Sequence, residues 1–86
     1  MYSVLLNKQA TKHLDALPDA VARRVHIRLQ QLRQDPRPTG CKKLKAKTDT
    51  YRIRVRDHCV VYDIDDTAHL VTILRINHRK DIYRNV

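Results

Sequence analysis

The N-terminal part of the chain changes from one apolar spacing to another, and each spacing predicts a different element. The segment Tyr2–Leu6 ("YSVLL") is a short run of β-forming residues and predicts a strand. Ala10, Leu14 and Leu17 then recur on one face of a helix, and Asn7 stands where a helix N-cap is expected. A strand followed by a short amphipathic helix is therefore predicted.

A second helix is predicted from about Pro18 to Gln34. Proline interrupts the first helix and suits the first turn of the next one. The helical stripe that follows consists of Val21, Val25, Leu29 and Leu32. The segment "DPRPTG", with two prolines and the only glycine of the chain, ends this helix. The two helices should form a hairpin.

The C-terminal half has the two-residue period of strands. In "TYRIRVRD", Tyr51, Ile53 and Val55 point one way, and Arg52, Arg54 and Arg56 the other. Next come a tight turn at "RDH", a strand "CVVYDI", a turn "DDTA" and an apolar strand "HLVTILRI". This order is typical of a β-meander.

These elements predict one domain, residues 1–86, of the α+β class. It should contain an N-terminal strand, a helical hairpin and a three-stranded antiparallel meander packed against the helices. The helices would cover one sheet face. The alternating arginines would emerge on the other, which becomes the candidate site.

The charge balance narrows the choice of partner. The chain has 18 Lys and Arg against nine Asp and no Glu, a net charge of +9. Such a surplus favours a polyanionic partner such as nucleic acid, whereas mere solubility is the simpler alternative. No apolar run is long enough to span a membrane, and "MYSVLLNK" is too short for a leader, so we expect a cytoplasmic protein.

Metal and cofactor sites are not expected. Cys41 and Cys59 should be free thiols, because the two cysteines and the histidines show no zinc-ligand spacing. The carboxylates of "DIDD" lie at a predicted turn, where they would face water or oppose nearby cations.

Basic residues concentrate just before and within the first meander strand. Seven of the fifteen residues from Lys42 to Arg56 are basic, namely Lys42, Lys43, Lys45, Lys47, Arg52, Arg54 and Arg56. Like charges at this density favour phosphate binding, although a solvated outer face is the alternative.

The tail "RINHRKDIYRNV" carries residue types that move protons and hold phosphates. His78 is of a residue type that can give or take a proton, Arg79 stabilises negative charge, and Tyr83 can orient a hydroxyl or stack on a base. Arg75 adds a further cation. The alternative is a basic cap whose apolar side chains pack on the sheet.

Together, the motifs "KLK", "YRIRV", "VVYDID" and "HRKDIY" resemble those of the RelE family of bacterial toxins, in the RelE/ParE superfamily. The specific matches lie between Lys43 and Tyr83, and the order of elements fits the family across nearly the whole chain. The resemblance implies a ribosome-dependent endonuclease that cuts mRNA in the A site. There the 2′-hydroxyl attacks the adjacent phosphate without a metal.

The resemblance also implies roles for particular residues. Arg52 and Arg54 stand where the family carries two lysines, and Lys45, Arg79 and Tyr83 match further motif positions. Cys59 stands where the family has an arginine. Because arginine is almost never deprotonated, Arg52 and Arg54 would clamp phosphate and make poor bases.

Two substitutes follow from these departures. His78 or Tyr83 would take over proton transfer, with Lys45 as a further candidate, and Arg56 or Arg75 would offset the arginine missing at Cys59.

The resemblance implies a cognate antitoxin that neutralises the toxin, together with the ribosome and mRNA as targets. Two alternatives remain at this point. One is a ParE-like inhibitor of DNA gyrase without nuclease activity, and the other is a degenerate toxin that binds the ribosome without cutting.

Overall fold

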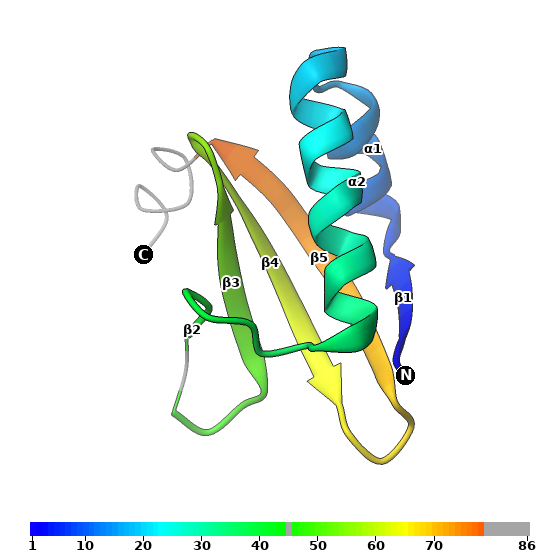
Figure 1. The fold of residues 1–86 in the computed structure, drawn as a ribbon, viewed down its shortest axis with the longest axis vertical. Helices are drawn as coiled ribbons and strands as arrows, with labels where there is room; N and C mark the ends of the chain where they lie inside the picture. Colours follow the sequence, from blue (N-terminus) through cyan, green and yellow to red (C-terminus); the bar gives the residue numbers. More distant parts are fainter. Residues whose placement is uncertain (45, 79–86) are drawn as a thin grey trace.

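In the part of the chain that the structure describes, one sheet is combined with two helices that pack on the same face (Figure 1). The computed structural model describes residues 1–44 and 46–78. Within them, the elements in chain order are β1 (Ser3–Leu6), α1 (Lys8–Asp15), α2 (Asp19–Gln34), β2 (Lys42–Lys43), β3 (Thr50–Val55), β4 (His58–Asp65) and β5 (Leu70–His78). The predicted α+β fold, with a strand, a helical hairpin and a meander, is confirmed.

The sheet holds two more strands than the meander alone. Its strand order is β1-β5-β4-β3-β2, with β1 parallel to β5 and every other neighbouring pair antiparallel. β1 therefore lies at one edge beside the last strand of the chain, and the two-residue β2 lies at the other edge. In Figure 1 the helices lie toward the β1 and β5 side of the sheet, and β2 lies at the edge away from them.

The helix ends follow from local capping. Asn7 is the N-cap of α1, since its side chain accepts a hydrogen bond of 2.8 Å from the Ala10 N–H. α1 ends at Asp15, so Leu17 lies beyond the helix, although it still packs against the core. Pro18 was predicted in the first turn of α2, but it is the N-cap and has extended backbone.

The main core lies between the helices and the sheet. Val25, Leu29 and Leu32 of α2 are buried, as the apolar stripe predicted. They pack with the sheet residues Tyr51, Ile53, Val55, Val60, Tyr62, Ile64, Val71, Ile73 and Ile76. Among the described residues, the opposite sheet face carries a small buried apolar cluster, Cys59 and Val61 with Leu74 packed against them. We call this face, on which neither α1 nor α2 packs, the open face.

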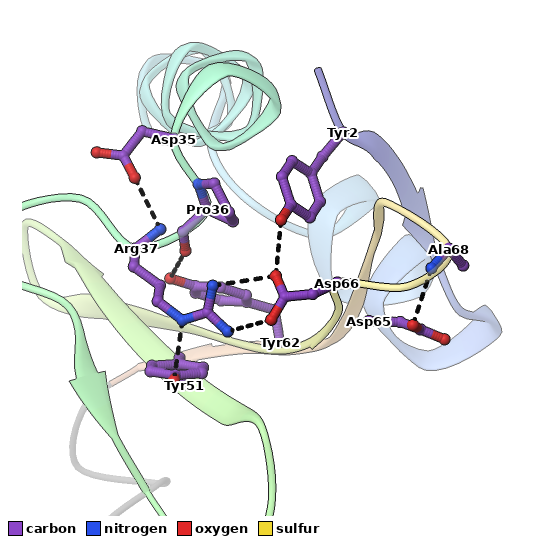
Figure 2. A network of polar contacts seen from close by, with 9 residues as sticks. All are labelled: Tyr2, Asp35, Pro36, Arg37, Tyr51, Tyr62, Asp65, Asp66 and Ala68. Atoms are coloured by element: carbon purple, nitrogen blue, oxygen red, sulfur yellow. Dashed lines mark hydrogen bonds and ion pairs between the residues drawn. The ribbon is translucent and has the colours of Figure 1, made fainter.

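A polar network fixes the loop that leads from α2 to β2 (Figure 2). The Arg37 guanidinium donates to both carboxylate oxygens of Asp66, at 3.2 and 2.9 Å, and through Nε to the Tyr51 hydroxyl at 3.0 Å. Tyr2 donates a hydrogen bond of 2.6 Å to Oδ1 of Asp66, which also accepts the 3.2 Å bond from Arg37. Tyr62, fully buried, donates to the Pro36 carbonyl at 2.9 Å. The loop is thus tied to β3, β4 and the β4–β5 turn.

These contacts shift the acidities of the groups involved. The Arg37 guanidinium, followed by the Tyr2 hydroxyl, lowers the pKa of Asp66 to about 2. The same carboxylate raises the pKa of the Tyr2 phenol, because it accepts a hydrogen bond from the phenolic proton and would repel the phenolate. Burial is the main cause of the raised pKa of Tyr62.

Candidate functional site

A row of positions across four strands brings cations together on the open face. Lys42 of β2 pairs with Arg52 of β3, Arg52 pairs with Val61 of β4, and Val61 pairs with Arg75 of β5. Directly paired residues point to the same face of a sheet, and neighbouring strands lie about 4.8 Å apart. We call Lys42, Arg52 and Arg75 the cationic row. It spans about 14 Å, with the apolar Val61 between the two arginines.

A β-bulge explains why Arg75 belongs to this row. The register between β4 and β5 shifts at Val61 and Tyr62, which pair with Arg75 and Ile73, so Leu74 is an extra residue in β5. Strict alternation from the buried Ile73 would have turned Arg75 toward the helices. The bulge instead leaves Leu74 packed against Val61 and places Arg75 beside it on the open face.

The next row along the strands lacks a second cation. Arg54 pairs with Cys59, and Cys59 pairs with Asn77. Cys59 is fully buried in the small apolar cluster of the open face. Arg75, proposed to offset the arginine missing at Cys59, lies one row away and on the neighbouring strand.

The expectation that Arg56 continues the β3 arginine series is wrong. β3 ends at Val55, and Arg56 occupies a turn with φ of 56°, a left-handed conformation that favours glycine. Arg56 and Arg54 line a hollow of about 430 Å³ together with Arg24 and Arg28 of α2. The sequence pattern of α2 did not indicate that Arg24 and Arg28 would lie beside the arginines of β3 and its turn.

The lysines preceding β3 do not share one face. Lys42 lies with Arg52, whereas Lys43 pairs with Tyr51 and so lies on the helix side of the sheet. Lys47 is exposed in the turn between β2 and β3. Lys45 falls outside the described residues. Of this predicted lysine cluster, the register brings only Lys42 into the cationic row.

The register also separates His78 from the cationic row. His78 pairs with His58, two positions beyond the core pair Val60 and Ile76, so both imidazoles lie on the helix side of the sheet. Their ring centroids are 5.5 Å apart in an edge-on arrangement. His78, a candidate for proton transfer, therefore lies on the opposite face of the sheet from Arg52. Arg79 and Tyr83 lie outside the described residues.

The opposite end of the open face is acidic. Thr50, Asp63 and Thr72 form a row there, and a hollow of about 580 Å³ adds Asp49, Asp65 and Asp66. The carboxylates of "DIDD" have partners: Asp63 accepts from Thr50, Asp65 from the Ala68 N–H, and Asp66 from Arg37 and Tyr2. In residues 1–44 and 46–78, no group of three or more His, Cys, Asp or Glu side chains is placed so that it could hold a metal ion. The open face is thus polarised from cationic to acidic.

Comparison with known proteins identifies the family of this chain. Residues 4–83 match the family model described as "ParE toxin of type II toxin-antitoxin system, parDE". The chain belongs to the RelE/ParE toxin superfamily. This toxin is 32% identical to Toxin RelG of Mycobacterium tuberculosis (strain ATCC 25618 / H37Rv), over 96% of its own chain and 97% of the relative.

Solved toxin structures share the fold. RelE in the archaeal RelE–RelB complex of Pyrococcus horikoshii OT3 superposes with a TM-score of 0.82 and 31% identity, covering 91% of this toxin and 94% of that chain. A chain of the toxin–antitoxin complex RelBE2 of Mycobacterium tuberculosis gives a TM-score of 0.79 and 29% identity, covering 91% and 98%. The resemblance inferred from the sequence motifs is confirmed at the level of the superfamily, and the chain is a toxin of a type II toxin–antitoxin system. No helix among the described residues is long and apolar enough to cross a membrane.

Proposed function

We propose that this toxin is a ribosome-dependent endoribonuclease that cuts mRNA in the A site. A 2′-hydroxyl loses its proton and attacks the adjacent phosphorus, the bond to the 5′-oxygen of the next nucleotide breaks as that oxygen takes up a proton, and a 2′,3′-cyclic phosphate is left. The cationic row is the observation that carries the proposal. A phosphate above Val61 would lie between Arg52 and Arg75, each about one strand spacing away, with Lys42 beyond Arg52. Fixed cations at this position stabilise the charge that develops on the phosphorane.

The chemistry divides into a clamp and a proton-transfer step. Arg52, Arg75 and Lys42 form the clamp, and arginines suit it because they stay charged and bind phosphate in two-pronged geometry. Since His78 lies on the other face, we assign proton transfer to Tyr83, with Lys45 as the further candidate. Arg79, which like Tyr83 matches a motif position of the family, would add charge stabilisation. No metal or cofactor takes part in this scheme.

The polarity of the open face supports a preferred direction for the RNA backbone. Phosphates are attracted to the cationic row and repelled by the row that contains Asp63. An RNA strand would therefore cross the sheet near Arg52 and stay away from the β4–β5 turn. The ribosome would supply the remaining contacts that hold the mRNA.

We further propose a cognate antitoxin as the neutralising partner in the cytoplasm. The similar structures from Pyrococcus horikoshii and Mycobacterium tuberculosis are toxin–antitoxin complexes. In this toxin, the hollow between α2 and β3 combines four arginines with Ile27, whose side chain is 58% exposed. Such a surface suits an acidic amphipathic segment that folds as it binds.

One experiment tests the nuclease directly. The purified toxin is added to a translating extract and the 5′ ends of the mRNA are mapped. New ends phased with codons, absent when Arg52→Gln replaces the wild type, are the expected result. Intact mRNA in an extract whose translation has stopped would contradict the proposal.

DNA gyrase inhibition is the second candidate, favoured by the match to the ParE model. A supercoiling assay run alongside separates the two. Inhibited supercoiling with uncut mRNA assigns the toxin to the gyrase class. We expect supercoiling to be unaffected.

A further inference from the structure

A small hollow adjoins the cationic row on the open face. It has a volume of about 250 Å³ and is lined by Asn7, Gln9, Leu44, Thr50, Val61, Leu74 and Arg75. Val61 and Leu74 belong to the apolar cluster of this face, Leu44 follows β2, and Asn7 and Gln9 lie at the start of α1. We call these seven residues the niche. Val61 and Arg75 belong to both the niche and the row of paired positions.

We propose that the niche binds one nucleobase of the RNA whose phosphate lies on the cationic row. This inference rests on the proposed function and names a subsite of the same face. An apolar floor beside fixed cations matches the two halves of a nucleotide, a flat base and a charged phosphate. The volume is below the range of about 300–1,000 Å³ typical of pockets for drug-sized ligands, which suits a single ring system.

The polar groups of the niche fit a base edge. Gln9 is exposed and its amide has no hydrogen-bond partner among the described residues, so it can donate to and accept from a base. Thr50 already donates to Asp63, and Asn7 Oδ1 already accepts from Ala10, so both hold the wall in place. Within the described part of the chain, Arg75 Nε is buried without an acceptor, and a ligand oxygen at its guanidinium would offset part of that cost.

The bulge in β5 creates the niche. Without the extra residue, Leu74 and Arg75 would point to opposite faces. A base in contact with Leu74 and a phosphate bound by Arg75 could then not belong to one nucleotide. Bulges commonly redirect side chains next to functional sites. Here the redirection places an apolar and a cationic side chain side by side.

Methyl and side-chain NMR of the full-length toxin tests the proposal. Each of the four nucleoside 5′-monophosphates is titrated, with ribose 5-phosphate as the probe that lacks a base. We expect at least one nucleotide to shift the methyl signals of Val61 and Leu74 together with Arg75. Ribose 5-phosphate should shift Arg75 and leave the methyls in place.

A matched pair of leucine variants sharpens the result. Leu74→Ala should weaken nucleotide binding about fivefold and leave ribose 5-phosphate binding unchanged, because only the base loses contact area. Leu5→Ala removes the same atoms from an exposed leucine on the same face, outside the niche, and should change neither.

Three outcomes would overturn the proposal that the niche binds a nucleobase. They are methyl signals that no nucleotide moves, methyl signals that ribose 5-phosphate moves equally, and methyl signals that respond to an acidic peptide but to no nucleotide. The last result would assign the niche to a protein partner. Failure of the nuclease proposal looks different, because uncut mRNA in the extract would leave the nucleotide-induced methyl shifts intact.

Discussion

Replacing Tyr62 with phenylalanine tests how the core supports the cationic row. Tyr62 is fully buried, and its hydroxyl donates a hydrogen bond of 2.9 Å to the carbonyl of the buried Pro36. The variant loses this bond and leaves the carbonyl without a donor. The net contribution of one hydrogen bond to the free energy of unfolding is about 1 kcal/mol, and a buried acceptor left without a donor costs about 1–3 kcal/mol. We therefore expect Tyr62→Phe to lower the free energy of unfolding by about 2 kcal/mol.

Urea unfolding of both proteins, followed by far-UV circular dichroism, measures this loss. Tyr51→Phe is the matched control, because Tyr51 stacks on Tyr62 with ring centroids 6.1 Å apart, yet its hydroxyl bonds the half-exposed Arg37. Water can replace that partner, so we expect a loss of about 0.5 kcal/mol. Equal losses in the two variants would refute the reasoning. Because the Pro36 loop leads to β2, Tyr62→Phe should also weaken RNA binding.

Three further predictions concern charge and backbone. The pKa of Asp66 is lowered to about 2, so its contribution to stability is complete above its ordinary value of 3.8 and is lost as the pH falls toward 2. Thermal unfolding from pH 5 to pH 2 should show that the difference in Tm between the wild type and Asp66→Asn becomes smaller as the pH falls. A difference in Tm that stays constant would contradict the ion pair with Arg37. Arg56→Gly should raise the free energy of unfolding by up to about 1 kcal/mol, because glycine adopts the left-handed backbone conformation of this position without strain. Arg54→Gly within β3 should lower it, and urea unfolding measures both changes. With three phosphate contacts, the logarithm of RNA affinity should fall with log salt at a slope of about −2, and Arg52→Gln should reduce the magnitude by about 0.7. An unchanged slope would remove Arg52 from the phosphate contacts.

The elements with a strong period were predictable from the sequence. The alternation in β3 correctly separates the buried Tyr51 and Ile53 from Arg52 and Arg54, because one face of an antiparallel sheet packs on a core. The stripe on α2 predicts its buried face for the same reason. Asn7 as N-cap follows from side-chain chemistry alone.

Features that depend on pairing between distant segments were not predictable. A two-residue strand has no period, so nothing in "KK" indicated that Lys42 would align with Arg52. Ile73 and Leu74 are both apolar, so the sequence does not indicate that Leu74 is an extra residue. The register of β5 in turn decides that Arg75 faces the candidate site and that His78 does not. The open-face site is therefore set by strand register as much as by composition.

The placement of RNA on the cationic row is the central claim, and single-turnover cleavage on ribosomes programmed with a defined mRNA tests it most directly. Arg23, exposed on α2, provides the matched control for Arg52. Loss of one preorganised cation from the site should slow cleavage by about 100-fold or more in Arg52→Gln. Arg23→Gln should cut within about twofold of the wild-type rate, the small change expected of a surface substitution. Equal rates for Arg52→Gln and wild type would contradict the claim.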